Sequence, residues 1–109
     1  MYAVIFTAER LVLDDEYNQT AEKMRTLAFE KYNCVDFQSL REGDKEITIS
    51  YWKNLDDIHA WKQDKEHIQA QQSGRDKWYR HYDVKIVEIL REYQEKRGSE
   101  TEKRGSETY

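Results

Sequence analysis

The sequence has a single cysteine, Cys34, among its 109 residues. One cysteine cannot form a disulfide within the chain, and such sparing use of cysteine is typical of proteins in a reducing compartment. The N-terminus has an apolar run with no basic region before it, so it does not resemble a signal peptide. No apolar run approaches the roughly 20 residues that a membrane-spanning helix needs. We therefore expect a soluble, cytoplasmic protein without a membrane partner.

The sequence also lacks the motifs of several common chemistries. It contains no glycine-rich dinucleotide fingerprint, no phosphate-binding loop and no cysteine and histidine spacing typical of zinc. His59 and His67 are eight residues apart, about 12 Å along a helix, which is too far to share one metal ion. The formal net charge is −4, whereas nucleic-acid binding normally needs a basic surface. We expect no metal, no cofactor and no nucleic-acid partner.

The end of the chain differs in composition from the rest. The unit EKRGSET occurs twice in tandem, at residues 95–101 and 102–108. It contains no apolar residue, so it cannot bury itself in a core. The predicted domain therefore spans residues 1–93, and residues 94–109 form a polar tail. Because hydrophobic residues make up only 38% of the chain, a monomer would have a thin core, which favours association into a dimer.

The spacing of apolar residues predicts the order of the structural elements. Strands are predicted at residues 2–7, 34–40, 46–53 and 84–90. A helical repeat runs from Tyr17 to Ala28, and Asn54 and Gly74 bound a second helix as its predicted cap and stop. The order β-α-β-β-α-β predicts an α+β, ferredoxin-like fold, with a four-stranded antiparallel sheet and both helices on one face.

The second predicted helix is expected to pack through one face, on which Ile58, Trp61, Lys65 and Ile68 recur at helical spacing. The other side of the sheet would then stay uncovered. A second copy of the chain, pairing through that sheet face, would bury it.

Aromatic and polar residues follow a spaced pattern between Ile49 and Val84. The pattern consists of Ser50-Tyr51-Trp52, Ala60-Trp61, Glu66-His67, Ala70-Gln71, Gly74-Arg75, Trp78-Tyr79 and Tyr82. It resembles the antibiotic biosynthesis monooxygenase (ABM) superfamily of dimeric α/β-barrels. The predicted element order extends the resemblance from about Tyr2 to about Leu90.

The resemblance implies a homodimer, in which two sheets form a barrel, and a pocket between each sheet and its helices. Trp61 matches a tryptophan that commonly lines this pocket. Haem-degrading members carry a histidine ligand ten residues after it, where this chain has Gln71. They also carry an asparagine near the first strand, for which the best match is Glu9. These departures argue against haem degradation by the same mechanism.

A small set of residues forms the predicted site. Trp61 either stacks on a flat aromatic substrate or is a core residue, and both interpretations stay open. His67 is the candidate catalytic base, since imidazole titrates near neutral pH; the alternative is a surface histidine bonded to Asp64 or Glu66. Tyr51, Glu9, Gln71 and Trp78 complete the predicted substrate-binding set.

Two functions of different classes follow. The first is cofactor-independent oxygenation of a phenolic or quinol-like compound, in which a base deprotonates the substrate so that it reacts with O2 directly. The alternative is a non-catalytic homodimer that binds a small aromatic ligand or fills its pocket with side chains. Haem binding or degradation is a third, less favoured hypothesis. A pocket without free volume would exclude the enzyme, because the substrate would have no site.

Overall fold

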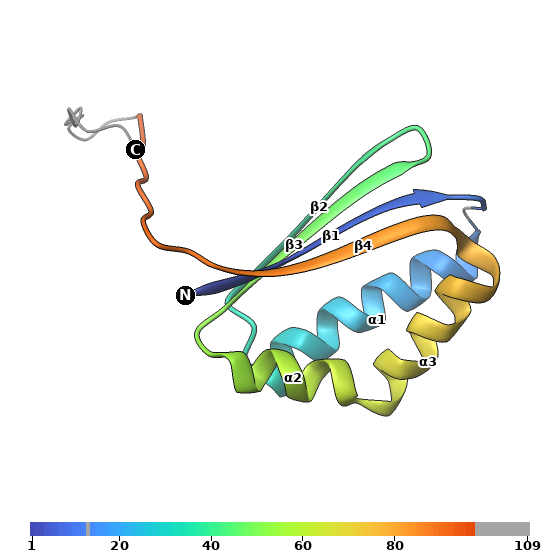
Figure 1. The fold of residues 1–109 in the computed structure, drawn as a ribbon, viewed down its shortest axis with the longest axis horizontal. Coiled ribbons are helices and arrows are strands. Elements are labelled where there is room, and N and C mark those ends of the chain that lie inside the picture. The colour runs from blue at the N-terminus through green and yellow to red at the C-terminus, as the bar shows by residue number, and fades with distance from the viewer. Residues whose placement is uncertain (13, 98–109) are drawn as a thin grey trace.

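A computed structural model describes residues 1–12 and 14–97 of the chain. Its elements are β1 (Tyr2–Arg10), α1 (Asp15–Tyr32), β2 (Asp36–Glu42), β3 (Lys45–Trp52), α2 (Leu55–Gln63), α3 (Lys65–Ser73), the π-helical turn η1 (Gly74–Trp78) and β4 (Tyr79–Glu88). The strands form one antiparallel sheet in the order β2-β3-β1-β4. The helices lie together on one side of it (Figure 1). The predicted α+β, ferredoxin-like fold is confirmed.

Two of the observed strands are longer than the sequence predicted. β1 continues to Arg10 and β4 begins at Tyr79, so both strands are longer than their apolar runs indicated. Most of the tandem repeat, residues 98–108, and Tyr109 lie outside the described residues, and the domain boundary at residue 93 stays a prediction. Among the helices that the structure describes, none is both long and apolar enough to cross a membrane.

The strand register decides which side chains face the helices. β1 pairs Tyr2 with Trp52 at one end of the sheet and Ala8 with Glu46 toward the other. Alternation along β3 then places Glu46, Thr48, Ser50 and Trp52 in one row on the helix side. With a rise of about 3.3 Å per residue, the first and last members of this row stand roughly 20 Å apart. The row therefore reaches along most of the sheet.

The hydrophobic core gathers at the Trp52 end of that row. Its buried members are Val4, Met24, Ala28, Cys34, Trp52, Ile58 and Trp61. The Nε1–H of Trp61 donates to the backbone carbonyl of Met24 at 3.3 Å, and that of Trp52 donates to Ser50 Oγ at 2.9 Å. Both indole N–H groups are thus satisfied inside the core, as buried polar groups require.

The second predicted helix is in fact two helices, because the chain leaves helical geometry at Asp64 (φ −61°, ψ 138°). Its Oδ1 caps α3 by accepting from the Glu66 N–H at 2.9 Å, while its Oδ2 accepts from the Tyr32 hydroxyl at 2.6 Å. The Tyr32 hydrogen bond is the main reason that the pKa of Asp64 is lowered. The Asp64 carboxylate therefore caps α3 at the break after α2, and its hydrogen bond from Tyr32 connects this break to α1.

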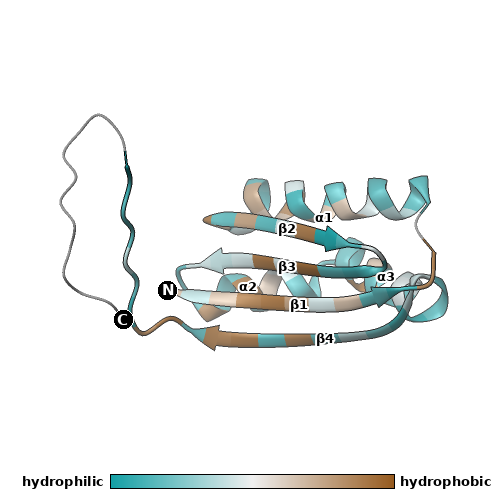
Figure 2. Ribbon diagram, turned by 90° about the horizontal axis from the view of Figure 1, so that it is seen from above, coloured by the Kyte–Doolittle hydropathy of each residue, from teal (hydrophilic) through white to brown (hydrophobic). Residues whose placement is uncertain are grey.

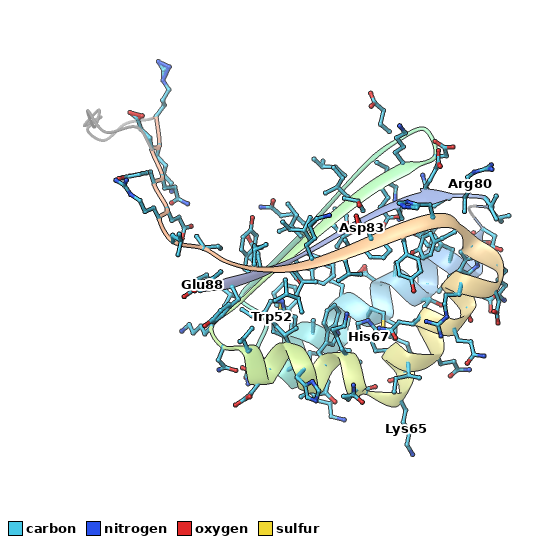
Figure 3. The ribbon with its side chains drawn as sticks, in the orientation of Figure 1. Trp52, Lys65, His67, Arg80, Asp83 and Glu88 are labelled. Atoms are coloured by element: carbon cyan, nitrogen blue, oxygen red, sulfur yellow. The ribbon has the colours of Figure 1, made fainter. Side chains whose placement is uncertain are left out.

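The break at Asp64 changes which residues face the sheet. Ile68 was predicted to share the buried face with Trp61, and this is wrong, since it is 44% exposed; Lys65, which the same pattern places at the edge of that face, is exposed. In Figure 3, Lys65 points away from the sheet, whereas His67 lies between α3 and the sheet. The change of direction therefore brings an imidazole inward.

The opposite face of the sheet has no helix over it. β3 presents Ile47, Ile49 and Tyr51 there, and β2 adds Leu40, whose side chain is 76% exposed. Apolar residues occupy the middle of β1, β3 and β4 when the sheet is seen from above (Figure 2). This open face is the surface through which the sequence predicts dimerisation.

The cap of α2 can be tested directly. Asn54 Oδ1 accepts from the Asp57 N–H at 2.9 Å, so Asn54→Ala should lower the free energy of unfolding by about 1 kcal/mol. Asn54→Ser, which keeps a capping oxygen, should lose much less. Urea unfolding followed by circular dichroism measures both, and equal stability of Asn54→Ala and the parent chain would contradict the role of this cap.

Candidate functional site

A cavity of about 510 Å³ lies between the helices and the sheet. This volume is within the usual range of about 300–1,000 Å³ for small-molecule sites. Four of the predicted site residues line it, namely Trp61, His67, Gln71 and Trp78. The large side chains therefore leave space between the helices and the sheet, and the objection that a filled pocket would exclude a substrate does not apply.

Aromatic rings build one end of the cavity. Trp61 packs against Trp52 with ring centroids 5.1 Å apart and against Phe37 at 6.2 Å. The His67 ring meets the Trp61 ring nearly edge-on, with centroids 4.3 Å apart. Trp61 thus belongs to the core and to the cavity wall at once, so its two interpretations do not exclude each other.

His67 lines this end as a neutral imidazole. Burial, reinforced by the nearby charge of Lys62, lowers its pKa to about 4. Its Nδ1 is buried and has no hydrogen-bond partner among the described residues. The predicted alternative, a surface histidine bonded to a carboxylate, does not describe it: Asp64 binds Tyr32, and Glu66 pairs with Lys23 at 2.9 Å. The ring also hydrogen-bonds the Trp61 backbone, which opposes part of the pKa decrease. A neutral ring with an unpaired Nδ1 keeps the capacity for one more hydrogen bond.

Two predicted substrate residues, Tyr51 and Glu9, do not line this cavity, and their role in substrate binding stays a prediction. Tyr51 alternates with the inward-facing Trp52, so it projects from the open face. Glu9 alternates with Arg10 in the same way and lies 3.8 Å from Arg80 Nε. Arg80 is on the side of the sheet away from the helices (Figure 3). Strand periodicity separates these residues from Trp61.

The other end of the cavity is polar, and the sequence analysis did not predict it. The Tyr17 hydroxyl donates to Glu46 Oε1, and Thr48 Oγ1 donates to Glu46 Oε2 at 3.2 Å. The Tyr79 hydroxyl donates to the Tyr17 oxygen at 3.3 Å, and Arg10 Nε lies 3.9 Å from Glu46 Oε1. The alternation of β3 was the available signal, because Glu46 shares the inward phase of Thr48, Ser50 and Trp52.

Both tyrosines of this polar end stay protonated at neutral pH. Burial, followed by the hydrogen bond to Glu46, raises the pKa of Tyr17 far above its usual range. Burial likewise raises the pKa of Tyr79 to about 12. The Tyr17 hydroxyl therefore donates to Glu46, and the Tyr79 hydroxyl donates to the Tyr17 oxygen.

Gly74 serves close packing at the polar end. The α-helix α3 ends at Ser73, so Gly74 stands at the predicted helix stop, but its backbone is right-handed helical (φ −61°, ψ −47°) and the chain continues into the π-helical turn η1. A Cβ on Gly74 would stand 2.8 Å from Cε2 and 2.9 Å from Cδ2 of Tyr79, which is closer than carbon atoms pack. The missing side chain lets the Tyr79 ring reach the cavity.

The site offers little to a metal ion. Within residues 1–12 and 14–97, histidine, cysteine, aspartate and glutamate side chains do not gather in groups of three that could hold one. The chemistry of the cavity is that of aromatic rings, one imidazole and a hydrogen-bonded carboxylate.

Comparison with known proteins now identifies relatives. No protein-family model matches the chain. YqjZ, an uncharacterized protein of Bacillus subtilis, is 38% identical over 92 residues, which cover 84% of this chain and 81% of YqjZ. The chain belongs to the YqjZ family. The match covers a length comparable to the whole domain described above.

Solved structures share the fold of this YqjZ-family chain. SnoaB, a cofactor-independent oxygenase from Streptomyces nogalater, superposes with a TM-score of 0.71 at 10% identity, over 84% of this chain and 94% of SnoaB. A proposed antibiotic biosynthesis monooxygenase from Nitrosomonas europaea gives 0.66 at 15% identity, over 82% and 89% of the two chains. Rv0793 from Mycobacterium tuberculosis gives 0.69 at 11% identity, over 85% and 98%. The fold is that of the ABM superfamily, as the sequence pattern indicated.

The lowered pKa of His67 makes stability depend on pH. Because the unfolded chain binds a proton near pH 6.5 and the folded chain only near pH 4, this group should lower the free energy of unfolding as pH falls through that range, by up to about 3 kcal/mol. His67→Gln should remove this part of the pH dependence, as measured by urea unfolding at several pH values. An NMR midpoint near 6.5 for the His67 ring would contradict the effect of burial.

The close approach of Tyr79 to Gly74 predicts that a side chain added at residue 74 disturbs this packing. Gly74→Ala should displace the Tyr79 ring and weaken the hydrogen bond from Tyr79 to Tyr17, because an added methyl group overlaps the ring. We expect a loss of about 1–3 kcal/mol in stability. The double variant Gly74→Ala/Tyr79→Ala should lose less than the sum of its single variants, whereas strict additivity in urea unfolding would argue against the contact.

Proposed function

We propose that this chain binds a small phenolic or quinol-like compound in the cavity and promotes its oxygenation by O2 without flavin or metal. The observation that carries the proposal is the cavity itself, in which Trp61 and an unpartnered imidazole nitrogen of His67 meet. The shared fold with SnoaB, which is a cofactor-independent oxygenase, supports the reaction class. Because one fold serves many functions, the shared fold supports this reaction class only together with the cavity.

In the proposed reaction, a substrate ring packs beside Trp61 and its hydroxyl donates to the free nitrogen of His67. Removal of the phenolic proton makes the ring electron-rich enough to react with O2. A CH2 group in the keto form of the ring then becomes C=O, with one oxygen atom in the product and the other in water. The substrate supplies all four electrons, so no external reductant is needed.

The low pKa of His67 limits how this proton moves. A free phenol has a pKa near 10, so full transfer to a group of pKa about 4 is unfavourable by about 6 pKa units, or ~8 kcal/mol. We propose that His67 accepts a hydrogen bond in the resting complex. It takes the proton only as negative charge develops beside it, where the new imidazolium stabilises that charge.

The low pKa is also what favours the second candidate function, a non-catalytic protein that binds an aromatic ligand in the same cavity. A neutral imidazole that is a weak base serves ligand binding without change. The two functions share Trp61 and His67 as ligand contacts and differ only in whether O2 is consumed.

We further propose that the active form is a homodimer joined through the open face of the sheet. The exposed side chains of Leu40 and Ile47 and the neighbouring Tyr51 would be buried by a second copy. Tyr51 would then act at the interface between subunits and not in the cavity.

Oxygen uptake by the purified protein tests the function. With a panel of naphthols, quinols and polyphenols and no added cofactor, we expect uptake that His67→Gln lowers by about 10²-fold or more. Trp61→Phe keeps an aromatic core residue and should raise KM more than it lowers kcat.

His59→Gln is the matched control, since His59 is an exposed histidine on the neighbouring helix, and it should retain full uptake. Uptake that survives His67→Gln would remove His67 from the chemistry. If the whole panel binds but no oxygen is consumed, the ligand-binding alternative is correct.

A further inference from the structure

We infer that the polar end of the cavity is a second ligand subsite, in which Glu46 accepts a hydrogen bond from a ligand hydroxyl and Trp78 donates one to a ligand oxygen. The inference rests on the proposed function, in that the cavity binds an aromatic compound. It adds a specificity: the preferred compound carries a hydroxyl on the side of the ring system away from Trp61.

Glu46 keeps unused hydrogen-bonding capacity at the cavity wall. A carboxylate accepts about four hydrogen bonds, and two donors, Tyr17 and Thr48, are bonded to Glu46 among the described residues. Its side chain lines the cavity and is only 6% exposed. A ligand hydroxyl reaching this point would meet an acceptor that is already oriented by two donors.

The surroundings of Glu46 do not look like a purely structural ion pair. Arg10 is buried beside it, yet the contact is 3.9 Å, and the guanidinium donates through Nη2 to the Gly43 carbonyl at 2.7 Å. Arg10 Nε and Nη1 are buried without a hydrogen-bond acceptor among the described residues. Buried charges are costly unless their hydrogen bonds are satisfied. Polar groups with unused hydrogen-bonding capacity are unfavourable in a closed core, whereas at a cavity wall a ligand can pair with them.

Trp78 supplies the complementary donor. Its side chain is 97% buried, since only 3% of its surface is exposed, and it lines the same cavity. Its Nε1–H has no acceptor within the part of the chain that the structure describes. The ring meets Tyr17 edge-on with centroids 5.3 Å apart, which places the indole next to the residue that holds Glu46. The polar end therefore combines one strong acceptor with one unpaired donor.

The strand register sets the distance between the two ends of the cavity. Trp61 packs against Trp52, whereas Glu46 lies six residues earlier on the same strand, roughly 20 Å away along it. Neither a single phenol ring nor a naphthalene spans that length. A compound of two fused rings that binds at the polar end directs one hydroxyl to Glu46 and its far ring toward Trp61.

Binding of three naphthalene probes tests the inference by calorimetry. The probes are 2-naphthol, 2,6-dihydroxynaphthalene and 6-methoxy-2-naphthol, which differ in whether the second substituent donates a hydrogen bond. We expect the parent protein to bind the dihydroxy probe about tenfold more tightly than the methoxy probe, because a hydrogen bond to an ionised acceptor is strong. Glu46→Gln, which keeps the shape but not the charge, should reduce this preference to about threefold or less.

Glu22→Gln is the matched control. Glu22 also lines the cavity, but its side chain is 63% exposed, so its replacement should leave the preference unchanged. Trp78→Phe keeps a ring in the same packing and removes only the N–H. It should weaken the binding of the two probes that carry an oxygen at position 6 severalfold relative to 2-naphthol, and it provides a second test if Glu46→Gln folds poorly.

The outcomes separate the two proposals. If all three probes bind with the same affinity to the parent protein, the second subsite is wrong and the proposed aromatic cavity stands. An equal loss of preference in Glu22→Gln and Glu46→Gln would reduce the effect to general charge and would also overturn the subsite. If no probe binds, both the subsite and the proposed function are contradicted.

Discussion

The packing of Trp61 is the interaction on which the rest of the structure depends. Its ring lies against Trp52 of β3 and Phe37 of β2, and its N–H donates to a carbonyl of α1. The Trp61 side chain therefore connects α2 to β2, β3 and α1. Because Trp61 also forms part of the cavity wall, the same contacts that hold the layers together define where a ligand can enter.

Asp64 determines how α3 is placed beside Trp61. Its carboxylate is held by Tyr32 and by the first turn of α3, and this geometry ends α2 after Gln63. The new direction of the chain brings the imidazole of His67 against Trp61, where it is partly buried. Burial then keeps the imidazole neutral. The Asp64 cap thus sets the position of an imidazole three residues further along the chain, and its charge opposes part of the pKa decrease that burial causes there.

The two ends of the cavity differ in chemistry because they lie at different points of one strand. Near Trp52, the inward row is surrounded by aromatic and aliphatic side chains. Near Glu46, Tyr17, Thr48 and Arg10 surround a buried carboxylate. Such a cluster costs desolvation energy and leaves donors unpaired. A ligand with polar groups at its ends would restore these hydrogen bonds, which is why we regard the cavity as a recognition site and not as a packing defect.

Periodicity by itself determined the element order and the phase of each strand, since buried and exposed positions repeat every two residues in strands and about every 3.6 in helices. The resemblance to the ABM superfamily, and not periodicity, grouped Trp61, His67, Gln71 and Trp78 into one predicted site. Periodicity did not reveal the break at Asp64, because a capping carboxylate needs the distant Tyr32 to hold it. Periodicity also did not show that Tyr51 and Glu9 face away from the cavity, or that Glu46 contacts Tyr17. Those relations join residues far apart in the chain, and only the register of β1 with β3 and the packing of α1 onto the sheet create them.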